Sequence, residues 1–203
     1  MTNVEFTTLL MLSTATSFSP GPNTTLSTAL AANLGFKRSL RFVMAVPAGW
    51  GLLFSICAGG VGALIFALPP LRVAIQALGI GYMLWLAFKL FRSGTLKQAD
   101  TSQLNITFLQ GVMLQFLNIK AWMLALAVVA GWVAGHADAW SRFAITLPVM
   151  LCFGFFSNLT YALIGSLLRA WLDGPAESRR RLHWFNRIMA VVLASTAAWL
   201  CTL

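Results

Sequence analysis

The side chain best suited to binding a ligand is Lys120, a cation about 14 residues into a long apolar stretch, residues 106–134. A charge at the centre of a lipid bilayer costs at least about 2.5 to 3.5 kcal/mol, so such a residue is by default a functional one. We expect a ligand carboxylate to be its counter-ion. The alternative is that Lys120 extends to the membrane surface. All five acids of the chain lie at ends of apolar stretches or in connecting segments: Glu5, Asp100, Asp138, Asp173 and Glu177.

A second candidate is the segment from Ser19 to Thr25, which holds two prolines, a glycine and several hydroxyl and amide side chains. It lies in the middle of residues 6–36, which are 31 residues without a charge, and about 20 apolar residues suffice to cross a bilayer. Proline breaks a helix, and broken backbone is tolerated in a membrane only where it faces protein or a polar cavity. We predict a discontinuous membrane helix with a binding site at the break. Two short elements joined by a re-entrant turn are the alternative.

The residues at this break offer groups of both polarities. A half-helix that starts at Pro22 would present free N–H groups and a positive dipole end, which attract an anion. Asn23 and Thr24 could add side-chain contacts to a ligand, or only cap the half-helix. The unwound backbone at Pro20 and Gly21 could offer carbonyl oxygens to an amino group.

Amide side chains lie near Lys120 and in one further apolar stretch. Gln115 and Asn118 are three residues apart, so they share a helix face close to Lys120. Asn158 either bonds neighbouring helices or lines the cavity. The predicted binding residues are Pro20, Gly21, Pro22, Asn23, Thr24, Gln115, Asn118, Lys120 and Asn158.

The composition excludes a water-soluble domain. Of the 203 residues, 59% are hydrophobic and 9% are charged, whereas a soluble domain averages about 25% charged residues. The net charge of +9 does not indicate nucleic-acid binding, because the basic residues form short clusters between apolar stretches. The pattern predicts an all-α membrane protein, one compact bundle of six transmembrane helices. The six stretches are residues 4–34, 42–68, 71–91, 106–134, 142–168 and 185–203.

The distribution of basic residues predicts the orientation. Eleven of the 14 Lys and Arg residues lie around the connections that follow the first, third and fifth stretches, and two lie at the opposite turns. Because cytoplasmic loops carry the excess of basic residues, both termini are predicted on the non-cytoplasmic side. The linker 93–105 divides the single domain 1–203 into halves 1–92 and 106–203, which enter the membrane from opposite sides. Interruptions of the first and fourth helices, at matching positions in the two inverted halves, are typical of a secondary transporter.

Other chemistry has little support in the sequence. His136 and His183 lie in or beside connecting segments, and neither a hydrolase set nor a phosphate-binding glycine loop is present, so we expect neither an enzyme nor direct use of ATP, and no metal or other cofactor. Cys57 and Cys152 fall in matching thirds of the two halves, which leaves a membrane thiol–disulfide electron carrier as an alternative. Small buried apolar residues are the simpler interpretation of both cysteines. A membrane assembly or sensor subunit without transport activity is a further alternative.

The chain resembles the LysE/RhtB family of amino-acid exporters over essentially its whole length. The segment Ser19-Pro20-Gly21-Pro22-Asn23 is similar to the family's Pro-Gly-Pro signature, and the segment from Gln115 to Lys120 to its Gln-x-x-Asn-Pro-Lys signature. The segment from Gly79 to Lys89 resembles its Gly-Ala-x-Tyr-Leu-x-Trp-Leu-Gly-x-Lys stretch. The resemblance implies export of a small amino acid across the bacterial inner membrane, with a proton as the coupling ion. The implied partners are this substrate, the proton and the lipid bilayer, and a homodimer is compatible with the pattern.

Two departures from the family pattern bear on the substrate. Ile119 stands where the family has a proline, so we expect the fourth helix to be less sharply broken. Gly49-Trp50 stands where many members carry an acid, so a cationic substrate side chain would lack its partner. Both departures are similar to the branch that exports cysteine and O-acetylserine. This implies a small neutral substrate, of the cysteine, O-acetylserine, threonine or homoserine kind. The residue chemistry agrees with a zwitterion whose carboxylate would meet Lys120 and the half-helix start at Asn23–Thr25.

Overall fold

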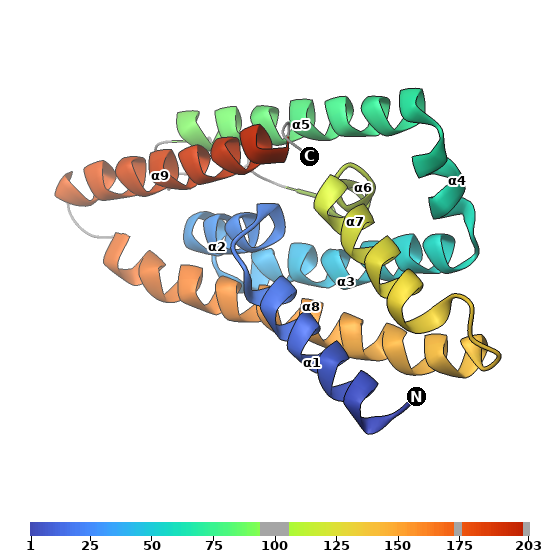
Figure 1. Ribbon diagram of the computed structural model, residues 1–203. Helices are drawn as coiled ribbons and strands as arrows, with labels where there is room; N and C mark the ends of the chain where they lie inside the picture. Colours follow the sequence, from blue (N-terminus) through green and yellow to red (C-terminus); the bar gives the residue numbers. More distant parts are fainter. Residues whose placement is uncertain (94–105, 173–175, 201–203) are drawn as a thin grey trace.

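The structure, a computed structural model, describes residues 1–93, 106–172 and 176–200, and these are helical apart from short turns (Figure 1). The predicted all-α class is confirmed, since these ranges contain no strand. The predicted linker 93–105 lies outside them except for Ser93. The helices are α1 (Asn3–Phe18), α2 (Pro22–Leu34), α3 (Phe36–Ala58), α4 (Val61–Ala67), α5 (Pro69–Arg92), α6 (Phe108–Phe116), α7 (Ile119–Val128), the π-helical turn η1 (Val129–Val133), α8 (Ala139–Leu172) and α9 (Ala176–Leu200).

Three of these helices, α3, α5 and α8, are long and apolar enough to cross a membrane. Helices α6 and α7 with η1 meet the same criteria together as a bent pair, which gives up to four spans in the described residues. Helices α1 and α2, with 16 and 13 residues, are each too short to span alone, and α9 has a charged first part. The membrane-protein class is therefore supported, while the count of six spans remains a prediction.

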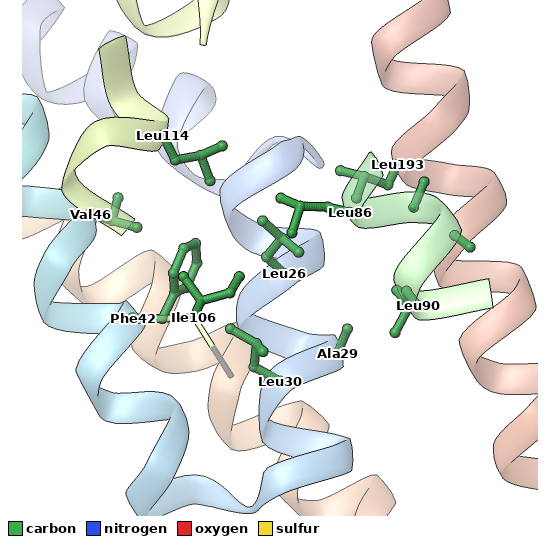
Figure 2. Close-up of a cluster of buried hydrophobic side chains, with 12 residues drawn as sticks. Leu26, Ala29, Leu30, Phe42, Val46, Leu86, Leu90, Ile106, Leu114 and Leu193 are labelled. Atoms are coloured by element: carbon green, nitrogen blue, oxygen red, sulfur yellow. The ribbon is translucent and has the colours of Figure 1, made fainter. Parts of the chain in front are cut away.

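Helix α2 lies at the centre of the molecule, between α3 and α8 on one side and the α5–α9 pair on the other (Figure 1). Eleven of its 13 residues are buried. Figure 2 shows Leu26 and Leu30 of α2 packed among apolar side chains of α3, α5, α6 and α9. A helix surrounded by protein on every side is one that needs no polar face. The chain break that precedes α2 therefore leads into the protein interior, with Pro20 exposed and Gly21 buried.

The second apolar stretch is not one helix, contrary to the interpretation of its sequence. Helix α3 ends at Ala58 and α4 starts at Val61, with Gly59 and Gly60 between them. Gly60 has a φ of 85°, in the left-handed region that other residues disfavour, so it turns the chain without strain. The chain turns again before Pro69, where Leu68 is extended and Pro69 begins α5.

The basic segments that follow the first, third and fifth stretches meet at one end of the molecule. An added Cβ at Gly35 would lie 2.5 Å from Nη1 of Arg169, at the far end of α8. The guanidinium of Arg187 on α9 lies 5.2 Å from the ring centroid of Phe91 on α5. This end carries most of the positive charge, as a cytoplasmic face does under the positive-inside rule. The orientation itself remains a prediction.

At the opposite end of α8, Arg142 ties the start of α1 to the segment that precedes α8. Its Nε donates to Asp138 Oδ1 at 2.8 Å, and its Nη1 donates to Glu5 Oε1 at 3.2 Å. The hydrogen bond from the Arg142 guanidinium lowers the pKa of the Asp138 carboxyl below its ordinary value, because it favours the ionised form. This cluster fixes α1 against α8.

We expect Asp138→Asn to lower the thermal midpoint modestly at neutral pH, because exposed ion pairs contribute little. A carboxyl whose pKa is depressed by folding stabilises the protein above its unfolded pKa, and the contribution is lost as the pH falls through the folded value. The difference from wild type should therefore shrink below about pH 4, near the ordinary aspartate pKa. This difference in thermal midpoint is measured by thermal unfolding in detergent, followed by tryptophan fluorescence, from neutral to acid pH. A difference that stays constant over this range would contradict the ion-pair explanation.

Candidate functional site

The breaks in two helical stretches lie against each other. The first, between α1 and α2, covers residues 19–21, and the second, between α6 and α7, covers residues 117–118. The Nζ atom of Lys120, at the start of α7, donates a 2.8 Å hydrogen bond to Oγ of Ser19. An added Cβ at Gly21 would lie 3.3 Å from the same Nζ. Lys120 therefore points into the first break and not towards the surface of the molecule.

A second pair of side chains joins the same two regions. Nδ2 of Asn23 donates to Oε1 of Gln115 at 2.9 Å, and Nε2 of Gln115 donates back to Oδ1 of Asn23 at 3.2 Å. Gln115 has no exposed surface and also donates to the carbonyl of Gly111. Its amide is thus committed to holding Asn23 in position.

The local sequence explains the first break. Gly21 is extended, with a φ of −171°, and Pro22 is the first residue of α2, where its missing N–H is not needed. The N–H of Gly21 donates to Oγ1 of Thr24 at 3.0 Å. Thr24 therefore caps the half-helix, as one of the two sequence interpretations predicted.

The second break is sharp even without the proline of the family signature. Helix α6 meets α7 and η1 at 66°. Asn118 takes the N-cap position of α7, and its Oδ1 accepts a 3.2 Å hydrogen bond from the backbone N–H of Lys120. The expectation of a gentler break at Ile119 is wrong, because an asparagine N-cap starts a new helix without a proline.

A cavity of about 80 Å³ lies at the two breaks, several times the volume of about 10–15 Å³ that one water molecule needs. Pro20 is exposed and does not line this cavity, and Gln115 lies behind its wall. The other seven predicted binding residues line it: Gly21, Pro22, Asn23, Thr24, Asn118, Lys120 and Asn158.

Among the residues that the structure describes, Lys120 is the only charged side chain that lines this cavity. Its side chain is half-buried, and among residues 1–93, 106–172 and 176–200 it takes part in no ion pair. Its recorded side-chain partner is the neutral hydroxyl of Ser19. A half-buried ammonium with only a neutral partner favours the binding of an anion, because the anion would supply the missing opposite charge.

Asn158 serves the packing of the helices. Its Oδ1 accepts a 2.8 Å hydrogen bond from Oγ of Ser27 on α2, and its Nδ2 donates to the carbonyl of Gly154 one turn earlier on α8. Both ends of the amide are therefore occupied. Of the two sequence interpretations, interhelical bonding describes its contacts, although Asn158 also lines the cavity.

The apolar wall of the cavity was missed by the sequence interpretation. Trp50 of α3, Leu124 of α7 and Met150 of α8 contribute to it. Gly49 lets α3 approach α6 closely, since an added Cβ there would lie 2.6 Å from the carbonyl oxygen of Val112. The glycines on either side of Trp50 are a signal that could have drawn attention to it, whereas Leu124 and Met150 look like any other apolar residues.

The two cysteines of the alternative function occupy different environments. Cys57 on α3 is buried in an apolar cluster, whereas Cys152 on α8 is exposed. Both are free thiols, and neither lines the cavity. No contact in the described residues favours an electron carrier.

Comparison with known proteins identifies the family. The model of the family "LysE type translocator" matches residues 14–202. Relatives named "Cysteine/O-acetylserine efflux protein", from Escherichia coli strain K12 and Shigella flexneri serotype 5b, are 27% identical over 179 residues, which is 88% of this chain and 86% of each relative. No solved structure gives a significant match. With the family match extending over nearly the whole chain, the protein belongs to the LysE-type translocators.

Proposed function

We propose that this protein is a secondary transporter that exports small neutral amino acids or their derivatives from the cytoplasm. Membership of the translocator family and the efflux function named for its relatives support this proposal. One observation carries it: the ammonium of Lys120 faces a cavity at the meeting point of two broken helices, without an opposite charge. A substrate carboxylate is the group that such a site is built to accept.

The contacts of the cavity support a zwitterionic substrate. Its carboxylate would bind Lys120 and the start of α2 at Asn23 and Thr24. Its amino group would find oxygen acceptors at the unwound backbone near Gly21 and at Asn118. Because no acid of the described residues lines the cavity, a cationic side chain would remain unpaired there, and the small volume favours a short side chain.

The proposal includes the six-span arrangement in two inverted halves, residence in the bacterial inner membrane with both termini on the non-cytoplasmic side, and proton coupling. Within the described part of the chain, Lys120 is the only ionisable side chain that lines the cavity. If protons drive export, Lys120 is the group that would take up and release the coupled proton when no substrate is bound. A lysine can serve this purpose because burial changes its proton affinity readily.

Inverted membrane vesicles test the proposal, because export from the cell then becomes uptake into the vesicle. With an acidic vesicle interior, we expect accumulation of labelled O-acetylserine or cysteine, competition by threonine and homoserine, and no competition by lysine or arginine. Collapse of the pH gradient should abolish accumulation.

Two controls separate the rival functions. Purified protein that catalyses no flux in liposomes, with any of these substrates, would contradict transport and favour an assembly or sensor subunit. The Cys57→Ser/Cys152→Ser double variant should transport like wild type, since neither thiol touches the cavity. Loss of flux in that variant alone would favour thiol chemistry.

A further inference from the structure

A second pocket lies far from the transport cavity, between the end of α8 and the start of α9. It has a volume of about 510 Å³ and lies at the basic end of the molecule. Its lining combines two arginines with aromatic and aliphatic side chains: Trp171, Arg180, Arg181, Trp184, Phe185 and Ile188. None of these residues lines the transport cavity, so the pocket calls for its own explanation.

The charge of this region is strongly positive. Between Arg169 and Arg187 the sequence holds five arginines against two acids. Arg180 and Arg181 are exposed, and no ion pair of either is found within the part of the chain that the structure describes. Both arginines line the pocket, and a guanidinium can bind a phosphate group with two parallel hydrogen bonds.

The rest of the pocket is apolar and exposed. Trp171, Trp184 and Ile188 have 59%, 54% and 58% of their surface accessible. The guanidinium of Arg181 lies 5.0 Å from the ring centroid of Trp171, which connects the charged part of the pocket to the apolar part. Arg180, Trp184 and Ile188 are spaced four residues apart along α9, so they form one row that leads from the charged end towards the apolar part of the helix.

This row matches the structure of a phospholipid better than that of a soluble anion. Tryptophans lie preferentially at the level of the lipid headgroups, and basic pockets between helices on the cytoplasmic side bind anionic headgroups. A soluble phosphate would use the two arginines but would leave the exposed apolar row uncovered. A lipid covers both, with its phosphate at the arginines and its acyl chain along Trp184 and Ile188.

We propose that the pocket between α8 and α9 is a binding site for an anionic phospholipid, with Arg180 and Arg181 as the phosphate ligands. The site would fasten the α8–α9 connection to the inner leaflet. It depends on the chain's lying in a membrane and is independent of which amino acid is exported.

The experiment uses purified full-length protein in a neutral detergent, titrated with phosphatidylglycerol or with phosphatidylcholine. Bound lipid is counted by native mass spectrometry, and the thermal midpoint is measured in parallel. We expect phosphatidylglycerol to bind and to raise the midpoint, and phosphatidylcholine to do neither. Since each basic residue near an anionic lipid contributes a few-fold in affinity, Arg180→Gln/Arg181→Gln should weaken phosphatidylglycerol binding by about 30-fold.

A matched control is Lys37→Gln/Arg38→Gln, which removes the same charge from two exposed residues at the same end. It should bind phosphatidylglycerol within about twofold of wild type. Equal weakening in both double variants would overturn the proposal in favour of diffuse surface charge. The same midpoint increase with inorganic phosphate alone would overturn it in favour of a soluble anion. Trp184→Ala should weaken lipid binding while both arginines remain, and unchanged affinity would contradict the acyl-chain contact.

Discussion

Replacing Lys120 by methionine is expected to reduce export by about 100-fold while the protein still inserts and folds. The substitution keeps most of the volume of the side chain and removes the ammonium, so the substrate carboxylate loses its opposite charge at the cavity. A hydrogen bond between charged groups contributes about 1.5 to 3 kcal/mol, which corresponds to roughly 10- to 150-fold in binding. The measurement is the initial rate of substrate uptake into inverted vesicles that contain equal amounts of wild-type or variant protein.

Stability separates a binding role from a structural role. Because Lys120 is half-buried with only the neutral Ser19 as its recorded side-chain partner, its removal should leave the thermal midpoint unchanged or raise it. The matched control is Lys37→Met, which removes an exposed lysine outside the cavity and should transport like wild type. Wild-type uptake by Lys120→Met would remove the basis of the proposed site, and a large loss of stability would reassign the lysine to a structural role.

Replacing Gly79 by alanine is expected to damage both stability and transport, although the change adds only one methyl group. Gly79 lies on α5, and an added Cβ there would lie 1.8 Å from the carbonyl oxygen of Leu117. That carbonyl belongs to the second break, next to the N-cap Asn118. Neither backbone can move aside without separating α5 from the break, and overpacking of this kind costs about 1–3 kcal/mol. We expect a lower thermal midpoint and at least about a tenfold loss of uptake.

Gly81 provides the control for this substitution on the same helix. A Cβ at Gly81 would have no other atom within 4 Å. Both substitutions gain up to about 1 kcal/mol of helix propensity, so only the contact with Leu117 distinguishes them. Gly81→Ala should be as stable as wild type or slightly more so. Equal thermal midpoints of the two variants would show that the contact of α5 with Leu117 does not stabilise the break between α6 and α7.

The features that could be predicted from the sequence are those that depend on one residue alone, through its effect on its own backbone or through the cost of removing it from water. Pro22 is well suited to the first turn of a helix, where its missing N–H is not needed, and Lys120 is conspicuous in any apolar stretch. The sharp bend at Ile119 escaped prediction because Asn118 performs the capping by its side chain. The break at Gly60 was missed because glycine serves close packing and chain reversal equally well, and only the neighbouring helices decide between them.

The residues of the cavity wall could not be predicted from the sequence for the same reason. Met150 contributes to it only because α8 passes beside the break between α1 and α2, and this depends on contacts between residues far apart in sequence. The roles of Gln115 and Asn158 follow equally from their partners. As isolated amides they are candidates for substrate contact, yet in the folded chain their hydrogen bonds connect helices.

The two hydrogen-bonded bridges, from Ser19 to Lys120 and from Asn23 to Gln115, run between segments about a hundred residues apart in the chain. Either half can therefore shift at this level only by straining or breaking bonds that the other half also needs. Such mutual dependence disfavours a state in which the path is open to both compartments at once. In the transport cycle proposed above, this would protect the cell from an uncontrolled leak of amino acids and, if protons drive export, from dissipation of its proton gradient.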